Sequence, residues 1–288
     1  MRVAVHGPSG VNKKKYLEPI VRKAGRNDID LKLFNVGDLM YQKRPDIKQG
    51  KILDLPFSEL NELRRTVLEQ IAKEINSVEN AILNTHACFR WKRTLFPAFD
   101  RELMDKFSPD MYVTIIDDVD VMRARLELDP YWKGKHSLAE LMTWRDDELV
   151  LTELVASYQS CLFKRKIPHY LIARKHPTDV LYNLMFKPEM KKVYASFPIT
   201  HVKGMPKTMK EIKEFKNGLK DLVVVFDPLT IKERDLVYKM NAALEDGRRT
   251  FAKKVLGRPT KFHVSEIKSI KDHIDGQIVA RDYKMIDQ

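Results

Sequence analysis

The chain has 288 residues, 43% of them hydrophobic, which is enough for sizeable cores in one large domain or two medium-sized ones. Its formal net charge of +12 favours anionic partners such as nucleotides, but the basic residues are scattered without interleaved aromatic residues, which argues against nucleic acid. The sequence contains no run of about 18 apolar residues, so no membrane span is predicted. Cys88 and Cys161 form no metal or disulfide pattern, so a reducing, cytoplasmic setting fits best.

The first predicted element is a short apolar strand, Arg2 to Val5, which a turn connects to a helix over about Lys13 to Ala24. The turn reads Gly7-Pro8-Ser9-Gly10-Val11-Asn12-Lys13-Lys14. This order follows the phosphate-binding pattern G-x-x-x-x-G-K-[ST], with Asn12 in place of the second glycine and Lys14 in place of the hydroxyl residue. Backbone N–H groups at such a turn bind phosphate, so these eight residues are expected to contact a nucleotide. An ordinary strand-to-helix turn is the alternative.

Further apolar runs of strand length alternate with helical patterns along the first two thirds of the chain. The predicted strands are Leu31 to Asn35, Ala81 to Asn84, Tyr112 to Ile116 and His169 to Ala173. The predicted helices include Phe57 to Ile75, about Asp147 to Arg165, and Thr178 to Phe186. This alternation predicts a three-layer α/β domain with a parallel five-stranded sheet over residues 1–187.

A second, smaller α/β domain is predicted over residues 188–288, after the break Lys187-Pro188-Glu189. Its elements are a strand over Lys192 to Phe197, a helix over about Pro206 to Leu219, and a strand over Leu222 to Phe226. This order is Rossmann-like. Two strands make a poor sheet, which leaves open that the domain is incomplete in this chain.

With these elements in place, the first domain resembles the nucleoside monophosphate kinases, and among them the archaeal adenylate kinases. After the phosphate loop, Phe34-Asn35-Val36-Gly37-Asp38-Leu39-Met40 is similar to the family's N-x-G-D-x-M segment at the monophosphate site. Ala81 to Ala87 is similar to its strand ending in D-T-H, and Phe107 to Asp110 resembles its L-x-P-D turn. Arg123 and Arg125 match the arginines at which the family's lid begins.

The resemblance implies a P-loop fold that binds ATP or another nucleoside triphosphate. Lys13, Arg123 and Arg125 would neutralise the transferring phosphates, and Gly37, Asp38 and Met40 would position the acceptor nucleotide. His86 and Arg90 follow the third strand, where open α/β sheets bind ligands, although His86 could equally be a structural histidine. Lys13 is expected to face solvent in the unliganded protein.

The departures from the family concern magnesium. Lys14 stands where the family has its magnesium-binding hydroxyl, and Asn84 stands where it has a carboxylate. Both changes remove oxygen ligands suited to a hard cation, so magnesium is only weakly supported and phosphotransfer is expected to be weak or lost. Asp117 and Asp118 could supply a substitute carboxylate, or could mark the start of a helix.

The second domain resembles the nucleoside 2-deoxyribosyltransferases more loosely. Tyr194-Ala195-Ser196-Phe197-Pro198 is similar to their opening strand, and Ile278 to Asp287 to a later segment. Three hypotheses follow: a monophosphate kinase of altered activity, a non-catalytic nucleotide sensor that regulates the second domain or a protein partner, and a longer chain acting on an N-glycosidic bond. The sequence does not decide the oligomeric state, and a homo-oligomer stays open.

Overall fold

A parallel sheet forms the centre of the computed structural model, which describes residues 1–48, 50–91, 94–197, 202 and 204–288. Five strands lie in the order β2-β3-β1-β6-β7. Their bounds are β1 Arg2–His6, β2 Leu31–Asn35, β3 Asn80–Asn84, β6 Met111–Ile116 and β7 His169–Ala173. All neighbouring pairs are parallel, so the carboxyl ends of the strands share one edge of the sheet. The sequence prediction of five strands in one parallel sheet is confirmed.

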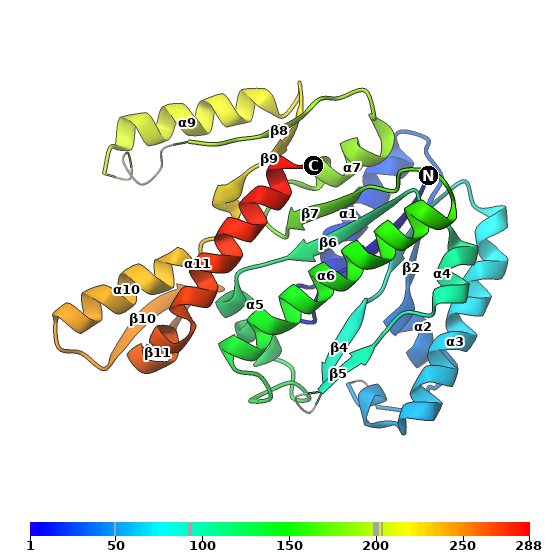
Figure 1. Cartoon of the computed structure of the whole chain (residues 1–288), viewed down its shortest axis with the longest axis horizontal. Coiled ribbons are helices and arrows are strands. Elements are labelled where there is room, and N and C mark those ends of the chain that lie inside the picture. Colours follow the sequence, from blue (N-terminus) through cyan, green and yellow to red (C-terminus); the bar gives the residue numbers. More distant parts are fainter. Residues whose placement is uncertain (49, 92–93, 198–201, 203) are drawn as a thin grey trace.

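Helices cover both faces of this sheet, which gives the three-layer architecture expected from the sequence (Figure 1). Val3 and Val5 of β1 face Leu17 and Ile20 of the first helix, whereas Ala4 faces the opposite layer. The α-helices of this part are α1 Lys13–Arg26, α2 Val36–Lys43, α3 Phe57–Glu74, α4 Arg101–Phe107, α5 Val119–Leu126, α6 Leu138–Leu162 and α7 Thr178–Phe186. Short 3-10 turns lie at Ile52–Asp54 and Ile75–Ser77, and an antiparallel hairpin joins β4 Cys88–Trp91 to β5 Thr94–Pro97.

The helix α6 begins at Leu138, earlier than the sequence analysis expected. A capping box sets this start: Glu140 N–H donates to Ser137 Oγ at 3.2 Å, and Ser137 N–H donates to Glu140 Oε2 at 2.8 Å. The pattern S-x-x-E was therefore available in the sequence. The added turns place Arg145 on the same helix as Glu148, which the predicted range already contained.

The described residues of the C-terminal part form a β-α-β unit and a hairpin joined to two helices. β8 Lys192–Tyr194 and β9 Val224–Phe226 pair in parallel, and α9 Pro206–Leu219 lies between them in the chain. The remaining elements are the 3-10 turn Pro228–Thr230, α10 Arg234–Glu245, the antiparallel pair β10 Thr250–Val255 and β11 Arg258–His263, and α11 Val264–Ile286. Sequence reasoning did not find the β10–β11 hairpin, and the expected motif's Pro198 lies outside the described residues.

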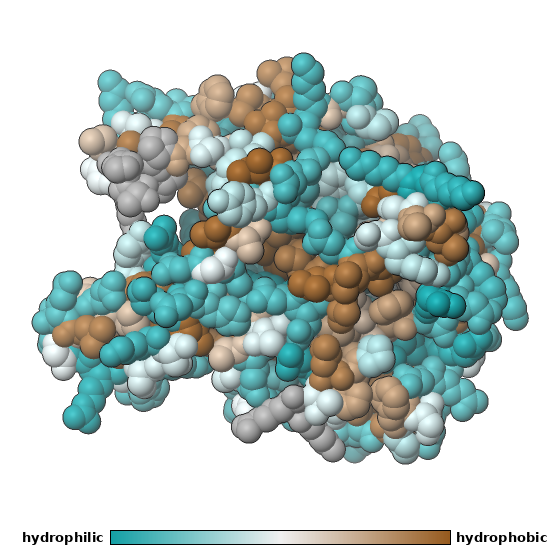
Figure 2. Space-filling view, viewed as in Figure 1, coloured by the Kyte–Doolittle hydropathy of each residue, from teal (hydrophilic) through white to brown (hydrophobic). Residues whose placement is uncertain are grey.

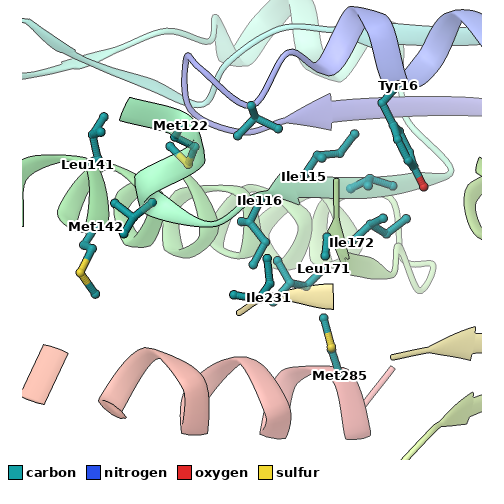
Figure 3. Packing of buried hydrophobic residues seen from close by; sticks show 14 of the residues in the cluster. Tyr16, Ile115, Ile116, Met122, Leu141, Met142, Leu171, Ile172, Ile231 and Met285 are labelled. Carbon is teal, nitrogen blue, oxygen red and sulfur yellow. The ribbon is translucent and has the colours of Figure 1, made fainter. Parts of the chain in front are cut away.

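The two parts of the chain share a hydrophobic core. Met285 of α11 and Ile231 point toward Leu171 and Ile116 of the central sheet (Figure 3). The contact also holds a buried ion pair, in which the Arg145 guanidinium faces the Glu233 carboxylate. A division at residue 187 therefore stays a proposal, and a fragment ending there would leave Arg145 without its carboxylate partner.

The outward face of α6 carries a row of exposed apolar side chains, Val150, Leu154, Tyr158 and Leu162. Apolar surface follows the line of this helix in the space-filling view (Figure 2).

Within the described residues, none of the helices is long and apolar enough to cross a membrane.

Candidate functional site

The loop from Gly7 to Asn12 connects β1 to α1 at the carboxyl edge of the sheet. Gly7 has φ +138°, and a Cβ there would collide with the carbonyl oxygen of Ile115 in the neighbouring strand β6. At Gly10, where φ is +86°, a Cβ would lie 2.9 Å from the carbonyl oxygen of Met122. The two glycines therefore allow the loop to lie flat against β6 and α5.

Asn12 adopts the left-handed backbone conformation, with φ 60° and ψ 53°. The family pattern has glycine here, and asparagine is the non-glycine residue that reaches this region at least cost. Because the Asn12 side chain is exposed, the replacement keeps the path of the loop without filling it. Asparagine at position 12, in place of the glycine of the family pattern, is thus compatible with the strand-loop-helix geometry.

Lys13 is buried, with 7% of its surface exposed, which contradicts the expectation that it faces solvent. Its ammonium donates to the Gly7 carbonyl and lies 3.3 Å from His86 Nε2. His86 Nδ1 in turn lies 2.7 Å from Glu148 Oε1, and Ala87 N–H donates to Glu148 Oε2 at 2.8 Å. These partners assign the His86 proton to Nδ1, so Nε2 accepts from Lys13. Without a ligand, the contacts with Gly7 and His86 hold the Lys13 ammonium inside the loop.

Burial sets the charge states in this chain of contacts. It lowers the pKa of Lys13 from 10.5 to about 8, and Glu148 opposes the shift. Burial also lowers the pKa of His86 well below its ordinary value, with Lys13 adding to the effect, so the imidazole is neutral. The pKa of the Glu148 carboxyl is raised by burial, and Lys13 counteracts this. The Lys13 side chain is therefore protonated at neutral pH, but it loses its proton at a lower pH than an ordinary lysine does.

The affinity for ATP should fall as the pH rises through about 8, because Lys13 then loses the proton that its phosphate contact requires. An ordinary lysine would hold affinity constant to about pH 10. Bound phosphate favours the ammonium, so binding above pH 8 should take up a proton. Calorimetry in two buffers of different ionisation enthalpy measures this uptake. A flat profile between pH 7 and about pH 9.5 would contradict the assignment of Lys13.

A cavity of about 320 Å³ opens beside the loop, at the carboxyl ends of β1, β2 and β3. Its lining residues come from the loop, from the end of β2 through α2 and the following segment to α3, from the β3–β4 connection, and from Phe89 and Trp132. In chain order they are Pro8, Ser9, Gly10, Asn12, Lys13, Lys14, Asn35, Val36, Gly37, Asp38, Met40, Tyr41, Gly50, Ile52, Leu53, Leu60, Arg64, Asn84, Thr85, His86, Phe89 and Trp132. This is the edge at which open α/β sheets bind ligands.

Arg64, Phe89, Trp132 and Glu148 were not found by sequence reasoning. Arg64 is a buried cation on α3 whose pKa is lowered to about 10 by burial. It donates to the Pro97 carbonyl at 3.2 Å and lines the cavity. A signal existed, because Arg64 lies within the apolar stripe of its helix, between Leu60 and Val67. The cavity therefore has a second buried cation besides Lys13.

The residues at the expected magnesium position do not fit that ion. Lys14 Nζ forms a 2.6 Å ion pair with Asp38 Oδ2, and this hydrogen bond raises the pKa of Lys14, so its ammonium stays charged. Asn84 Nδ2 donates to Asn35 Oδ1 at 2.7 Å, and Asn84 Oδ1 is buried without a hydrogen-bond partner among the described residues. An ammonium at Lys14 and a neutral amide at Asn84 are poor ligands for a hard dication, and the nearby Asp38 carboxylate is already paired with Lys14.

Several predicted site residues lie outside the cavity. Arg125 lies behind the loop, donates to the Gly10 carbonyl at 2.8 Å and pairs with Asp117 at 2.7 Å. Arg123 pairs with Glu266 of α11, and its guanidinium lies over the Phe262 ring at 5.1 Å.

Arg90, Gly7 and Val11 also lie away from the cavity lining. Arg90 pairs with Asp147 of α6, and the side chain of the loop residue Val11 is fully buried in the core. Asp118, the alternative carboxylate, pairs with Lys175 and accepts from Lys232 N–H at 2.6 Å, so it faces the C-terminal part.

Comparisons with known proteins agree with this geometry. Residues 6–140 match the protein family described as an AAA domain. An adenylate kinase of Thermoplasma volcanium is 25% identical over 133 residues, which cover 45% of this chain and 69% of that protein.

Solved structures of shikimate kinases are similar over a comparable region. The enzyme of Acinetobacter baumannii covers 66% of this chain and 95% of its own, at 17% identity and a TM-score of 0.41. The enzyme of Bacteroides thetaiotaomicron covers 66% of this chain and 98% of its own, at 16% identity and a TM-score of 0.39. With the sequence matches and the loop geometry, the N-terminal part of this chain is a kinase-like P-loop nucleotide-binding domain that resembles the nucleoside monophosphate kinases.

Proposed function

We propose that this protein binds ATP or a related nucleoside triphosphate at the Gly7–Lys14 loop, and that its phosphotransfer to a nucleoside monophosphate is weak. The observation that carries the proposal is the single cavity that joins Lys13 of the loop to Asp38 of α2 and Arg64 of α3. A triphosphate at the loop and an anionic acceptor near Arg64 would share this space. Their phosphates would then meet between two buried cations, which is what phosphoryl transfer requires.

The roles of the individual residues follow from this arrangement. A triphosphate would draw the Lys13 ammonium away from the Gly7 carbonyl, because phosphate oxygens are stronger acceptors than a peptide oxygen. The unpartnered Asn84 Oδ1 would accept from a ligand hydroxyl or amino group. Arg125 would reach the phosphates only after leaving the Gly10 carbonyl and Asp117. Arg123 would have to leave Glu266, so these two arginines act as catalytic groups only if α5 moves.

Weak phosphotransfer is proposed because Lys14 supplies one positive charge where a dication would bridge two phosphate groups. A monovalent ammonium can retain binding through contacts of about 1.5–3 kcal/mol each. It cannot bridge and orient the β- and γ-phosphates as a metal ion does. Binding and catalysis should therefore separate in this protein.

Magnesium should raise the affinity for ATP by less than about tenfold in the natural protein, because Lys14, once the phosphates draw it from Asp38, supplies a positive charge beside them. The variant Lys14→Ser with Asn84→Asp returns both oxygen ligands, and it should show a magnesium-dependent gain larger than that. Calorimetric titration of ATP with EDTA or magnesium measures both proteins, and a coupled assay with AMP measures turnover.

An affinity gain of about a hundredfold on adding magnesium to the natural protein, with brisk turnover, would overturn the proposal. The variant Lys15→Ser is a matched control, since Lys15 is the next residue, is exposed, and does not line the cavity. Tight ATP binding without turnover in either protein would favour a nucleotide sensor.

The sensor is the second candidate, and the contacts of α5 favour it. Arg125 of this helix touches the loop carbonyls, while Asp120 pairs with Lys253 of β10 at 2.6 Å. Val119 N–H, at the start of the helix, donates to Glu233 at 2.6 Å. A nucleotide that displaced Arg125 would therefore act on a helix that the C-terminal part holds, and its occupancy could be relayed there.

A further inference from the structure

A second cavity, of about 260 Å³, lies between the two parts of the chain. One wall comes from the end of β7 and from α7, and the other comes from α9 and β9. The volume is close to the lower end of the range for small-molecule sites, about 300 Å³. The junction cavity, as we call it, shares no lining residue with the cavity at the phosphate-binding loop.

The charged lining of the junction cavity is mainly basic. Four lysines contribute to it: Lys175, Lys213, Lys216 and Lys220. The two acidic residues, Asp179 and Asp227, already pair with cations: Asp179 with Lys23 of α1 at 2.5 Å, and Asp227 with Lys216. The local charge therefore favours an anion.

Two of these lysines remain free to bind an anion. Over the described residues, neither Lys213 nor Lys220 forms an ion pair with a carboxylate, and Lys220 donates to Asn217 Oδ1 at 2.7 Å. Both lie on α9 or at its end, and both are exposed. Lysine ammonium groups held at the mouth of a cavity are ordinary phosphate ligands.

The buried side of the junction cavity, which we call its inner end, contains apolar side chains, His176 and one unsatisfied polar group. Val180 and Val225 line it and are buried. Asn183 of α7 also lines it, is 6% exposed, and its Oδ1 is buried without a hydrogen-bond partner in the part of the chain that the structure describes. A buried amide oxygen without a partner costs stability, which a ligand could recover. A carboxamide offers an acceptor beside a donor, the arrangement that the edge of a polar heterocycle complements.

We propose that the junction cavity binds a small phosphomonoester of mononucleotide size. Lys213 and Lys220 hold the phosphate at the mouth, Asn183 hydrogen-bonds the polar ring at the inner end, and the valines contact its apolar face. The ligand touches α7 of the first part and α9 of the second. It therefore fastens the two parts together, and this site is independent of the loop at Lys13.

Hydrogen exchange with AMP as the probe locates the binding, because the two sites fall in different peptides. AMP should slow exchange in peptides that cover α7 and α9, and this should persist in the variant Lys13→Met, in which the loop site is weakened. Inorganic phosphate, ribose 5-phosphate and adenosine separate the contributions of the phosphate, the sugar and the ring. Binding of ribose 5-phosphate as tightly as AMP would identify a sugar phosphate rather than a nucleotide as the ligand.

The charge variants decide whether the lysines carry the site. Lys213→Gln with Lys220→Gln should weaken AMP binding at the junction by about tenfold or more, because two charge-assisted contacts are lost. The matched control, Lys207→Gln with Lys210→Gln, changes the same charge on the same helix outside the cavity and should leave the affinity unchanged. Equal weakening in both variants would reduce the effect to general charge and overturn the proposal.

The variant Asn183→Leu tests whether Asn183 contributes to binding, and the variant protein should still fold. It removes a buried polar atom that has no partner, so the unliganded protein should unfold at the same temperature or a higher one. The slowing of exchange in α7 and α9 by AMP should be largely lost in the Lys13→Met background. Undiminished AMP protection of α7 and α9 in this variant would overturn the role of Asn183, and protection confined to the loop peptides would overturn the site.

Discussion

The variant Lys13→Met should lose ATP affinity by about tenfold to a hundredfold, the largest effect of any single change in the loop. A charge-assisted contact to phosphate contributes about 1.5–3 kcal/mol, which corresponds to this range. Methionine keeps the length and apolar stem of the side chain, so the buried space beside His86 and Glu148 stays filled. Glu148 loses a nearby cation, and because burial already raises the pKa of its carboxyl, it can take up a proton instead of unfolding the site. Calorimetry with ATP measures the loss.

The control for this change is Lys15→Met, which removes the same charge from an exposed position two residues further along α1. It should leave ATP affinity within about twofold of the natural protein, since surface charge is screened. Far-ultraviolet circular dichroism checks that both variants are folded. Undiminished ATP binding by a folded Lys13→Met protein would remove Lys13 from the phosphate site.

The variant Glu233→Ala should lower the free energy of unfolding by about 3–5 kcal/mol, because it leaves a buried guanidinium without its carboxylate. Arg145 Nη1 and Nη2 donate to the two Glu233 oxygens at 2.5 and 2.9 Å, and the two side chains are 6% and 1% exposed. The same carboxylate accepts from Val119 N–H at 2.6 Å. The loss should appear in urea unfolding followed by circular dichroism.

A double variant distinguishes the loss of charge pairing from the loss of packing. Arg145→Met combined with Glu233→Met removes both charges and should recover most of the loss, since an apolar replacement of a buried pair is often close to neutral. Glu245→Ala, an exposed acidic change at the end of α10, should cost less than about 0.5 kcal/mol. If Glu233→Ala behaves like Glu245→Ala, the pair does not hold the two parts of the chain together.

Local sequence patterns were sufficient to predict those elements whose residues are neighbours both in the sequence and in space. The strands Leu31–Asn35 and His169–Ala173 and the helices α7 and α9 have the bounds that the sequence predicted. For the strands and α7, apolar runs and helical periodicity report burial directly. The helix α9 has no buried residue, and proline in its first turn marks its start instead. The phosphate loop was found for the same reason, since Gly7 and Lys13 belong to one turn. The start of α6 was misplaced although its capping box, Ser137 and Glu140, was present in the sequence.

The ion-pair and hydrogen-bond partners of the charged residues could not be predicted from the sequence. Each of these contacts joins segments that only the folded chain brings together. Nothing near Lys13 in the sequence indicates that His86 and Glu148 bury it, and the expectation of an exposed side chain failed for that reason. Arg123 and Arg125 differ by two residues, yet Arg123 faces the C-terminal part and Arg125 faces the loop, because successive helical positions point in different directions.

The sequence by itself determined the parallel sheet and the strand-loop-helix at Gly7, because both depend on residue type and local spacing. The resemblance to the monophosphate kinases added that Lys14 and Asn84 stand where that family has its magnesium-binding side chains. The tertiary structure decided which side chains share the cavity with Lys13, that Lys14 pairs with Asp38, and that the second part shares a core with the first. Those contacts depend on packing between distant segments, which local periodicity does not encode.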